Sequence, residues 1–219
     1  MKIAILGTGM VGNALGSKLV ELGHSVWMGS RTANSDAGQQ WLRSVGGKGK
    51  IGTFADAASF GEIVFDCTNG ANSLAALKQA GAANLGRKIL IQVSNPLDFS
   101  KGMPPSLTVC NTDSLAEQIQ REFPQVRVIK VLSTMNCQVM VQPSVVPGDH
   151  SLFLCGNDAA ARKEAAQKLC EWFGWKPANI VDLGDLTGAR GMEMLLPLWL
   201  RLFGIFGNPT FNLHVVRGA

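Results

Sequence analysis

Short apolar runs alternate with stretches of helical spacing along most of this chain. The runs are rich in Ile, Val and Leu, whereas the stretches between them place an apolar residue every three or four positions. This alternation is typical of consecutive strand–helix–strand units, and it predicts an α/β fold on a mainly parallel sheet. The predicted strands are Lys2–Leu6, Ser25–Met28, Lys50–Thr53, Ile63–Cys67, Lys88–Val93 and Arg127–Leu132, and the predicted helices are Val11–Leu22, Asp36–Ser44, Ala71–Ala82 and Leu115–Phe123.

The stretch Pro143–Asp149, with the sequence PSVVPGD, interrupts this pattern and marks the boundary of a second unit. We expect two domains, a larger one over residues 1–146 and a small C-terminal α/β extension over residues 147–219. Within the larger domain, Asn95–Pro105 is a predicted loop, and Ser114-x-x-Glu117 predicts a capping box. The elements predicted for the extension are strands at Ser151–Leu154 and Ile180–Leu183, a helix at Asp158–Phe173 and a terminal helix at Ala189–Phe206.

A glycine-rich turn follows the first predicted strand. Gly7-Thr8-Gly9-Met10-Val11-Gly12 has the pattern G-x-G-x-x-G and leads directly into the first predicted helix. The first glycine makes the tight turn, the second lets the backbone approach a pyrophosphate, and the third lets helix and strand pack closely. The helix then offers its free N–H groups and the positive end of its dipole to the pyrophosphate. The larger domain is therefore predicted to be a Rossmann-type dinucleotide-binding domain with a doubly wound sheet.

The end of the second predicted strand predicts which dinucleotide binds. NAD sites normally place Asp or Glu there to hold the ribose 2′-hydroxyl. This chain has Ser30 and Arg31 instead, and the first acid that follows is Asp36. A guanidinium can pair with a 2′-phosphate and stack on adenine, whereas a carboxylate would repel the phosphate. We therefore predict NADP, with an ordinary solvent-exposed arginine as the alternative reading.

Two further strand ends carry short polar side chains. Thr68 and Asn69 follow the strand Ile63–Cys67, and Ser94-Asn95-Pro96 follows the strand Lys88–Val93. In open α/β sheets the ligand lies beyond the carboxyl ends of the strands. These residues are thus placed either to bind the ribose hydroxyls and the nicotinamide carboxamide, or simply to end their strands in turns.

The composition excludes several classes of protein. With 46% apolar and 16% charged residues, the chain can bury a sizeable core and is not disordered. The net charge is only +4 and no run of Lys or Arg occurs, so the sequence does not indicate a nucleic-acid-binding surface. The five cysteines form no C-x-x-C pair, so we expect no metal site and no disulfide, but free thiols in the cytoplasm. The apolar stretch Met194–Phe206 is too short to span a membrane and is interrupted by Pro197 and Arg201.

No side chain is placed as an obvious proton donor, and we assign no catalytic residue. The chain has no tyrosine, and its three histidines fall outside the predicted carboxyl ends of the strands. Lys130 lies inside a strand, where a structural role is expected. Such an enzyme is coherent if its second substrate is a redox cofactor such as FMN, FAD or a deazaflavin, because that ring carries the electronic burden. Apolar walls for a stacked ring could come from Met10, Val93, Met135 and the segment Met192–Leu200.

With these residues in place, nearly the whole chain resembles the NADP oxidoreductases that depend on the deazaflavin coenzyme F420. The cytosolic reductase domain of the six-transmembrane metalloreductases is also similar, although its membrane portion has no counterpart here. Beyond Gly7–Gly12, the likeness rests on Gly29-Ser30-Arg31, Ser114-Leu115-Ala116-Glu117, Val128-Ile129-Lys130-Val131, Cys155-Gly156-Asn157-Asp158, Asp182-Leu183-Gly184-Asp185-Leu186, Ala189-Arg190 and Glu193.

The resemblance implies particular roles for matching residues. It places the 2′-phosphate at Ser30 and Arg31 and the pyrophosphate at Thr8–Val11. It also places the nicotinamide near Ser94–Pro96 and near Thr134, Met135 and Asn136, and it implies dimerisation through the C-terminal helix. The segments Thr68-Asn69-Gly70 and Asn95-Pro96-Leu97-Asp98 depart from the archaeal deazaflavin enzymes and are more similar to bacterial relatives.

Three functions remain open at this point. The leading hypothesis is a cytoplasmic, homodimeric NADP(H)-dependent oxidoreductase that moves a hydride between NADP and a deazaflavin or flavin. An imine or ketone reductase of the pyrroline-carboxylate or hydroxyacid type is the second, and it would need a proton donor beside the nicotinamide. A non-catalytic NADP sensor that signals through a partner is the third.

Overall fold

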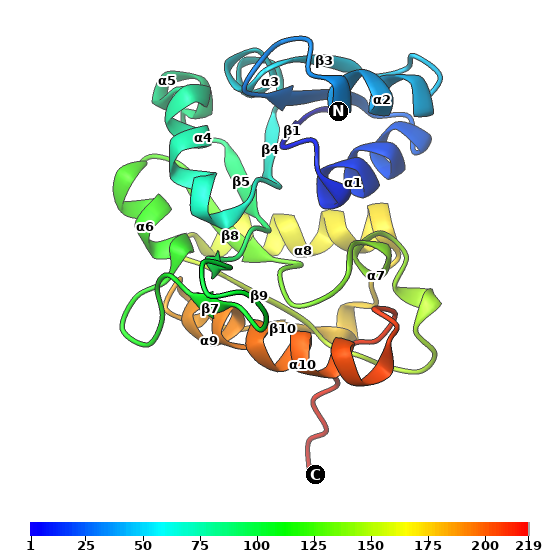
Figure 1. Cartoon of the computed structure of the whole chain (residues 1–219), viewed down its shortest axis with the longest axis vertical. Helices are drawn as coiled ribbons and strands as arrows, with labels where there is room; N and C mark the ends of the chain where they lie inside the picture. Colours follow the sequence, from blue (N-terminus) through cyan, green and yellow to red (C-terminus); the bar gives the residue numbers. More distant parts are fainter. Residues whose placement is uncertain (219) are drawn as a thin grey trace.

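A computed structural model describes residues 1–218, and its framework is an eight-stranded sheet with helices on both faces (Figure 1). The strands lie in the order β10-β9-β8-β5-β4-β1-β2-β3. Their bounds are β1 (Lys2–Leu6), β2 (Ser25–Ser30), β3 (Lys50–Thr53), β4 (Ile63–Asp66), β5 (Ile89–Gln92), β8 (Arg127–Val131), β9 (Leu152–Gly156) and β10 (Ile180–Asp182). A separate antiparallel pair joins β6 (Leu97–Asp98) to β7 (Ser106–Leu107).

The helices connect these strands and end in a pair at the C-terminal side of the chain. They are α1 (Met10–Glu21), α2 (Asp36–Ser44), α3 (Phe54–Phe60), α4 (Ser73–Ala80), α5 (Ala82–Leu85), α6 (Leu115–Glu122), α7 (Cys137–Val141), α8 (Ala159–Phe173), α9 (Gly188–Met194) and α10 (Leu196–Phe206), with 3-10 turns at Gly70–Asn72, Pro143–Val145 and Pro177–Asn179. In Figure 1 the blue and cyan N-terminal elements lie at one end of the molecule, and the orange α9 and α10 lie at the other.

The sheet is parallel except where β8 meets β9. All pairs from β3 to β8 are parallel, β8 pairs with β9 antiparallel, and β9 pairs with β10 parallel. The predicted Rossmann-type, mainly parallel α/β fold is confirmed. Strands β9 and β10, from the predicted extension, continue the same sheet, and the division into domains at residue 146 stays a prediction.

Alternate residues of each strand pack into two apolar cores, one on each face of the sheet. One core joins Ile5 and Phe65 to helices α1 and α8, for example through Leu15 and Leu169. The other core joins residues such as Val64, Leu90 and Val128 to helices α3, α4, α6 and α9. This arrangement follows from the period of two along a strand, because a continuous apolar run is buried on both faces of a parallel sheet.

Three local predictions from the sequence are corrected. The predicted terminal helix Ala189–Phe206 is two helices, because Pro197 lacks the N–H that would continue the ladder from α9. Helix α3 was not predicted, although Thr53 and Asp56 form a capping box at its start. At α6, Ser114 caps the helix as predicted, but the Glu117 carboxylate contacts the Ser114 hydroxyl and Arg190 instead of the Ser114 backbone N–H.

Two further expectations can be compared with residues 1–218. All five cysteines are free. No helix in this part of the chain has the length and apolar character needed to cross a membrane. The predicted cytoplasmic location stays a prediction.

Candidate dinucleotide-binding site

The glycine turn lies between the end of β1 and the start of α1, and on the side that faces the sheet it is closely packed. Gly7 has φ +116°, and a Cβ there would lie 2.6 Å from the Cys67 carbonyl oxygen, so both its backbone and its surroundings require glycine. A Cβ at Gly12 would collide with the Gly7 carbonyl oxygen. These two glycines therefore allow the close approach of α1 to the sheet.

The upper side of the same turn is open. Apart from Gly9 itself and the two residues beside it in the chain, no heavy atom lies within 4 Å of the position that a Cβ would take at Gly9, the N-cap of α1. No side chain caps the helix, and its first turn carries no acid. The Asn13 amide donates to the carbonyl oxygens of Thr8 (2.8 Å) and Gly9 (2.9 Å), which fixes the turn. Exposed N–H groups at the end of a 12-residue helix fit a pyrophosphate.

At the end of β2, Ser30 and Arg31 have different environments. The buried Ser30 hydroxyl donates to the Thr32 carbonyl oxygen at 2.5 Å and lies 3.0 Å from the Ser35 hydroxyl. Ser35 in turn caps α2 by accepting from the Gly38 N–H. The Arg31 side chain is exposed, and within residues 1–218 it forms no hydrogen bond or ion pair. Ser30 shapes the turn, and Arg31 is available to an anion.

The ends of β4 and β5 meet in a buried cluster of hydroxyl groups. Thr68 and Ser94 both donate to the Asp66 carboxylate, over 2.6 Å and 2.9 Å. The Ser73 hydroxyl lies between them, 2.8 Å from Thr68 Oγ1 and 2.7 Å from Ser94 Oγ. The hydroxyls of Thr68 and Ser94 are thus engaged with Asp66 beneath the strand ends.

A row of three buried polar side chains crosses the sheet under these ends. Asp66 in β4 is paired in register with Gln92 in β5, which is paired with Lys130 in β8. Lys130 donates to the Ser94 carbonyl oxygen at 2.5 Å and lies 3.0 Å from the Glu193 carboxylate of α9. Glu193 also accepts from the first N–H groups of α6. Burial lowers the pKa of the Lys130 ammonium, and Glu193 opposes that shift.

The row of Asp66, Gln92 and Lys130 was not predicted, although the sequence contains a signal for it. Each of three strands carries a polar residue at the matching place beside apolar neighbours, as in Ile63–Asp66, Ile89–Gln92 and Arg127–Val131, although the last of these also begins with an arginine. The contact of Lys130 with Glu193 had no such signal, because the two residues are far apart in the sequence. The structural role expected for Lys130 is consistent with its ion pair.

The remaining predicted residues lie where β4, β5 and β8 end. The Asn95 amide donates to the Ser133 carbonyl oxygen at 2.8 Å, which ties the two strand ends together. Asn136 caps α7, and Asn69 caps the 3-10 turn Gly70–Asn72. Thr134, Met135 and Pro96 are buried. Leu132 has φ +64°, a strained backbone conformation for a non-glycine residue at the point where the chain leaves β8.

The apolar slot predicted for a stacked ring is wrong in one part. Val93 and Met135 belong to one core, whereas Met192 belongs to the core on the opposite face and packs against Cys155. Met10 is 81% exposed at the start of α1. The Met192 side chain therefore does not share a wall with Val93.

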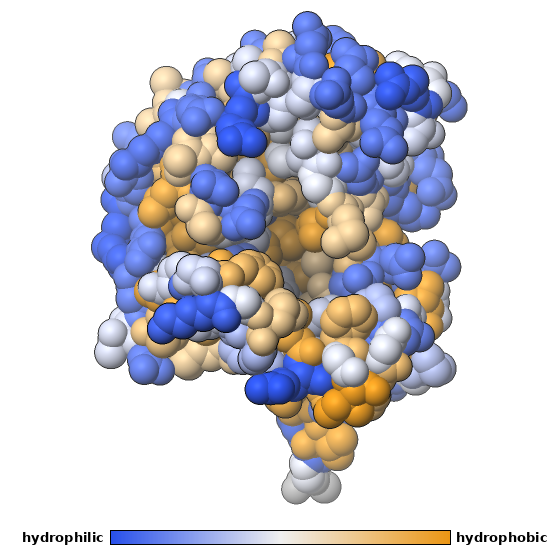
Figure 2. All heavy atoms as spheres, viewed as in Figure 1, coloured by the Kyte–Doolittle hydropathy of each residue, from blue (hydrophilic) through white to orange (hydrophobic). Residues whose placement is uncertain are grey.

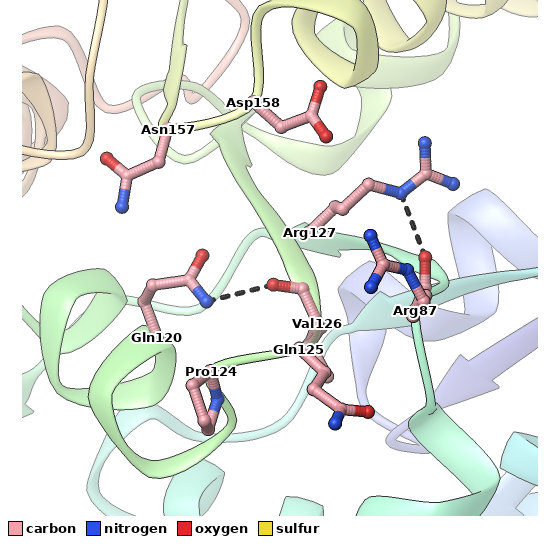
Figure 3. A pocket seen from close by; sticks show the side chains of 8 residues that line it. All are labelled: Arg87, Gln120, Pro124, Gln125, Val126, Arg127, Asn157 and Asp158. Carbon is pink, nitrogen blue, oxygen red and sulfur yellow. Dashed lines mark hydrogen bonds between the residues drawn. The ribbon is translucent and has the colours of Figure 1, made fainter.

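The space-filling view places a hollow on this face of the molecule. In Figure 2 the hollow opens near the centre of the view, between the part that carries α1 and α4 and the part that carries α9 and α10. A separate cavity of about 530 Å³ lies at the amino ends of β5 and β8 (Figure 3). Its lining consists of Arg87, Gln120, Pro124, Gln125, Val126, Arg127, Asn157 and Asp158, none of which belongs to the predicted site.

Known proteins resemble this chain over part or all of its length. The family profile described as NADP oxidoreductase, coenzyme F420-dependent, matches residues 2–96. The crystal structure of a candidate F420-dependent NADP reductase from Arthrobacter sp. FB24 is 49% identical, with a TM-score of 0.93 over 99% of this chain and 100% of that one. The metalloreductase STEAP3 of Rattus norvegicus is 30% identical over 206 residues, which are 90% of this chain and 38% of that protein.

The chain thus spans about two fifths of the length of that curated relative. An imine reductase from Myxococcus stipitatus in complex with NADP+ is 18% identical, with a TM-score of 0.64 over 94% of this chain and 64% of that one. At this level of identity the likeness concerns the fold.

Proposed function

Because this chain belongs to the family of coenzyme F420-dependent NADP oxidoreductases, and is an NADP-dependent oxidoreductase, we propose that it transfers a hydride between NADP(H) and a deazaflavin or flavin. The nicotinamide supplies or accepts that hydride, so the residues of this chain serve to bind, orient and polarise. The observation that carries the proposal is the open N-terminus of α1 at the glycine turn, with the unpaired Arg31 at the end of the neighbouring strand β2.

We assign the phosphate groups of NADP to these two features. The residues Gly7–Gly12 cradle the pyrophosphate, with Gly9 giving access to the N–H groups of Met10 and Val11. Arg31 binds the 2′-phosphate, and Ser30 shapes the turn that presents it. Both features are supported by charge, since the helix end is positive and the first turn of α1 carries no carboxylate.

We assign the nicotinamide side to the carboxyl ends of β4, β5 and β8. The backbone there is held in place by the Asn95–Ser133 hydrogen bond and by the Ser94 carbonyl contact with Lys130. Thr68, Asn69, Ser94, Pro96, Thr134, Met135 and Asn136 belong to the same strand-end segments. A stacked nicotinamide ring must be held in a fixed orientation, and a backbone fixed by these hydrogen bonds can provide that.

The choice of a deazaflavin or flavin as acceptor is supported by the small number of suitable proton donors in the sequence. The sequence contains no tyrosine. The His150 ring is buried against the Pro143 carbonyl oxygen and Asn212, outside the strand ends. An acceptor ring that distributes charge itself, such as a deazaflavin or flavin, places the smallest demand on a protein acid. The overall similarity to the candidate F420-dependent enzyme supports the same choice.

The experiment is an anaerobic measurement of NADPH oxidation with each acceptor in turn. Coenzyme F420, FMN, FAD, a ferric chelate and a cyclic imine are offered at equal concentration. We expect turnover with F420 or a flavin at least about tenfold faster than with the imine. Faster turnover with the imine would support the imine reductase instead. Tight NADPH binding with no turnover for any acceptor would support the sensor.

A further inference from the structure

Asp66 is fully buried, yet it forms no ion pair within residues 1–218. Its carboxylate accepts hydrogen bonds from the Thr68 N–H and hydroxyl and from the Ser94 hydroxyl, all of which are neutral. Within residues 1–218 no Lys, Arg or His atom lies within 4.0 Å of it. Lys130, two strands away in the same row, is neutralised by Glu193 at 3.0 Å. The net charge of the three groups is therefore that of Asp66.

The position of this charge is unusual for a sheet core. The residues two places earlier in the same strands, Val64, Leu90 and Val128, belong to the apolar core on that face. Asp66, Gln92 and Lys130 take the place of apolar residues in the last row before the strand ends. Burying a carboxylate without a counter-charge is costly, and its field reaches farther in a weakly polar interior than in water.

The position also coincides with the proposed nicotinamide side. Thr68 and Ser94, which donate to Asp66, are the residues at which the β4 and β5 segments leave the sheet. The nicotinamide ring is neutral in NADPH and positively charged in NADP+. A negative charge under the ring attracts the oxidised form and leaves the reduced form almost unaffected.

We propose that Asp66 is the fixed counter-charge of the nicotinamide, and that it biases the site towards NADP+ and therefore towards hydride donation by NADPH. This inference rests on the proposed function, and it adds a direction to it. Asp66 does not touch the nicotinamide but provides a fixed negative charge beneath it. The Lys130–Glu193 pair, which has no net charge, holds the Ser94 carbonyl group in place. The Gln92 amide donates to the same Ser94 carbonyl oxygen at 2.9 Å and to the Ser94 hydroxyl oxygen at 2.7 Å.

The test is the ratio of the dissociation constants of NADP+ and NADPH, measured separately by titration. For Asp66→Asn we expect NADP+ to lose about tenfold in affinity relative to NADPH, from unit charges interacting across a partly polar medium. Tenfold corresponds to about 30 mV in the potential of the bound two-electron couple. Adenosine 2′,5′-bisphosphate, which has no nicotinamide, should bind the variant and the wild type equally.

Variants of the neutral pair provide the controls. Lys130→Met removes a positive charge from the same row and should shift the ratio in the opposite direction. The double variant Lys130→Met/Glu193→Gln removes no net charge and should leave the ratio unchanged. If Asp66→Asn does not fold, as judged by circular dichroism, Glu193→Gln carries the test, with a smaller shift in the same direction as Asp66→Asn.

One outcome would contradict the inference about Asp66, and another would contradict the proposed function. If Asp66→Asn weakens NADP+ and NADPH by the same factor, Asp66 is only structural and the inference is wrong. If the wild-type protein binds neither nucleotide nor adenosine 2′,5′-bisphosphate, the proposed function itself is wrong.

Discussion

Arg31 and Ser30 are neighbours at the end of β2, and only Arg31 is free to contact a ligand. The single hydroxyl proton of Ser30 is directed to the Thr32 carbonyl oxygen, whereas the Arg31 guanidinium has no partner among residues 1–218. The sequence predicted both as phosphate ligands. The hydrogen bonds of Ser30 separate their roles, and they depend on the fold of the turn up to Ser35, which a strand-end motif does not specify.

Replacing Arg31 by alanine should weaken NADPH binding about 10- to 150-fold. Charge-assisted hydrogen bonds to a phosphate contribute roughly 1.5–3 kcal/mol, and each 1.4 kcal/mol is a factor of about ten. NADH lacks the 2′-phosphate, so its affinity should change little. The measurement is titration of both nucleotides at fixed salt, with Arg43→Ala, at an exposed residue of α2, as the charge-matched control. Equal losses for NADPH and NADH would contradict the assignment.

Two glycines of the turn should respond to alanine in opposite ways. A Cβ at Gly9 has free space, so Gly9→Ala should keep the melting temperature of the wild type. Its methyl group would occupy the open side of the turn, where the pyrophosphate is proposed to bind, and should reduce NADPH affinity. Gly12→Ala collides with the Gly7 carbonyl oxygen and should lower the stability by about 1–3 kcal/mol.

Thermal denaturation and NADPH titration of both variants check this pair of expectations. Gly9→Ala with wild-type affinity would show that the pyrophosphate does not approach this turn. The sequence pattern assigned different roles to these glycines, and the distances around each Cβ now make the difference measurable.

At the scale of elements, α6 and α9 are joined by polar contacts that local patterns could not reveal. Ser114 and Glu117 have the spacing of a capping box, yet Glu117 forms its closest contact with Arg190, at 2.6 Å. Arg190 holds the pKa of Glu117 below its ordinary value of 4.5. Local propensity predicted the start of the helix correctly, whereas the tertiary partner determined what the glutamate does.

This pair should make the docking of α9 sensitive to acid. A carboxyl whose pKa is lowered by folding stabilises the folded state above its ordinary pKa, and that contribution is lost as the pH falls through the lower folded-state value. Urea denaturation between about pH 6 and pH 3 should therefore show a steeper loss of stability in the wild type than in Arg190→Met. Parallel curves for the two proteins would show that the pair is too exposed to matter.

At the scale of the whole molecule, α10 presents an apolar surface with little to cover it. Ile205 and Phe206 are 76% and 57% exposed, whereas Leu196 is the one buried residue of the helix. Figure 2 shows hydrophobic side chains gathered at this lower end of the molecule. Trp199 stacks on Phe211 of the C-terminal tail at 5.1 Å, which covers part of the helix and leaves the rest open.

We expect this surface to form a homodimer with a second copy of the chain. Obligate interfaces of this kind often bury more than about 2,000 Å² in total. Sedimentation equilibrium at micromolar concentration should give a dimer for the wild type and a monomer for Ile205→Glu. The control is Leu22→Glu, at an exposed leucine that follows α1. A monomeric wild type would contradict the prediction.

The sequence predicted the fold more completely than it predicted the site. Apolar runs and the glycine turn located six strands to within two residues at either end, because burial on both faces leaves a strong pattern. The strand ends were identified as the site from the same reasoning. The row Asp66, Gln92 and Lys130 was not, because it appears only when register places three strands side by side.

The ion pair of Lys130 with Glu193 changes how distant substitutions should be interpreted. Glu193 belongs to α9, near the end of the chain, yet a single ammonium group joins its carboxylate to the Ser94 carbonyl oxygen. A random-mutagenesis screen for altered nucleotide use would therefore be expected to return changes in α9 alongside those in the glycine turn. In a sequence alignment such hits would look remote. In the folded protein, only the Lys130 ammonium group separates the Glu193 carboxylate from the Ser94 carbonyl oxygen.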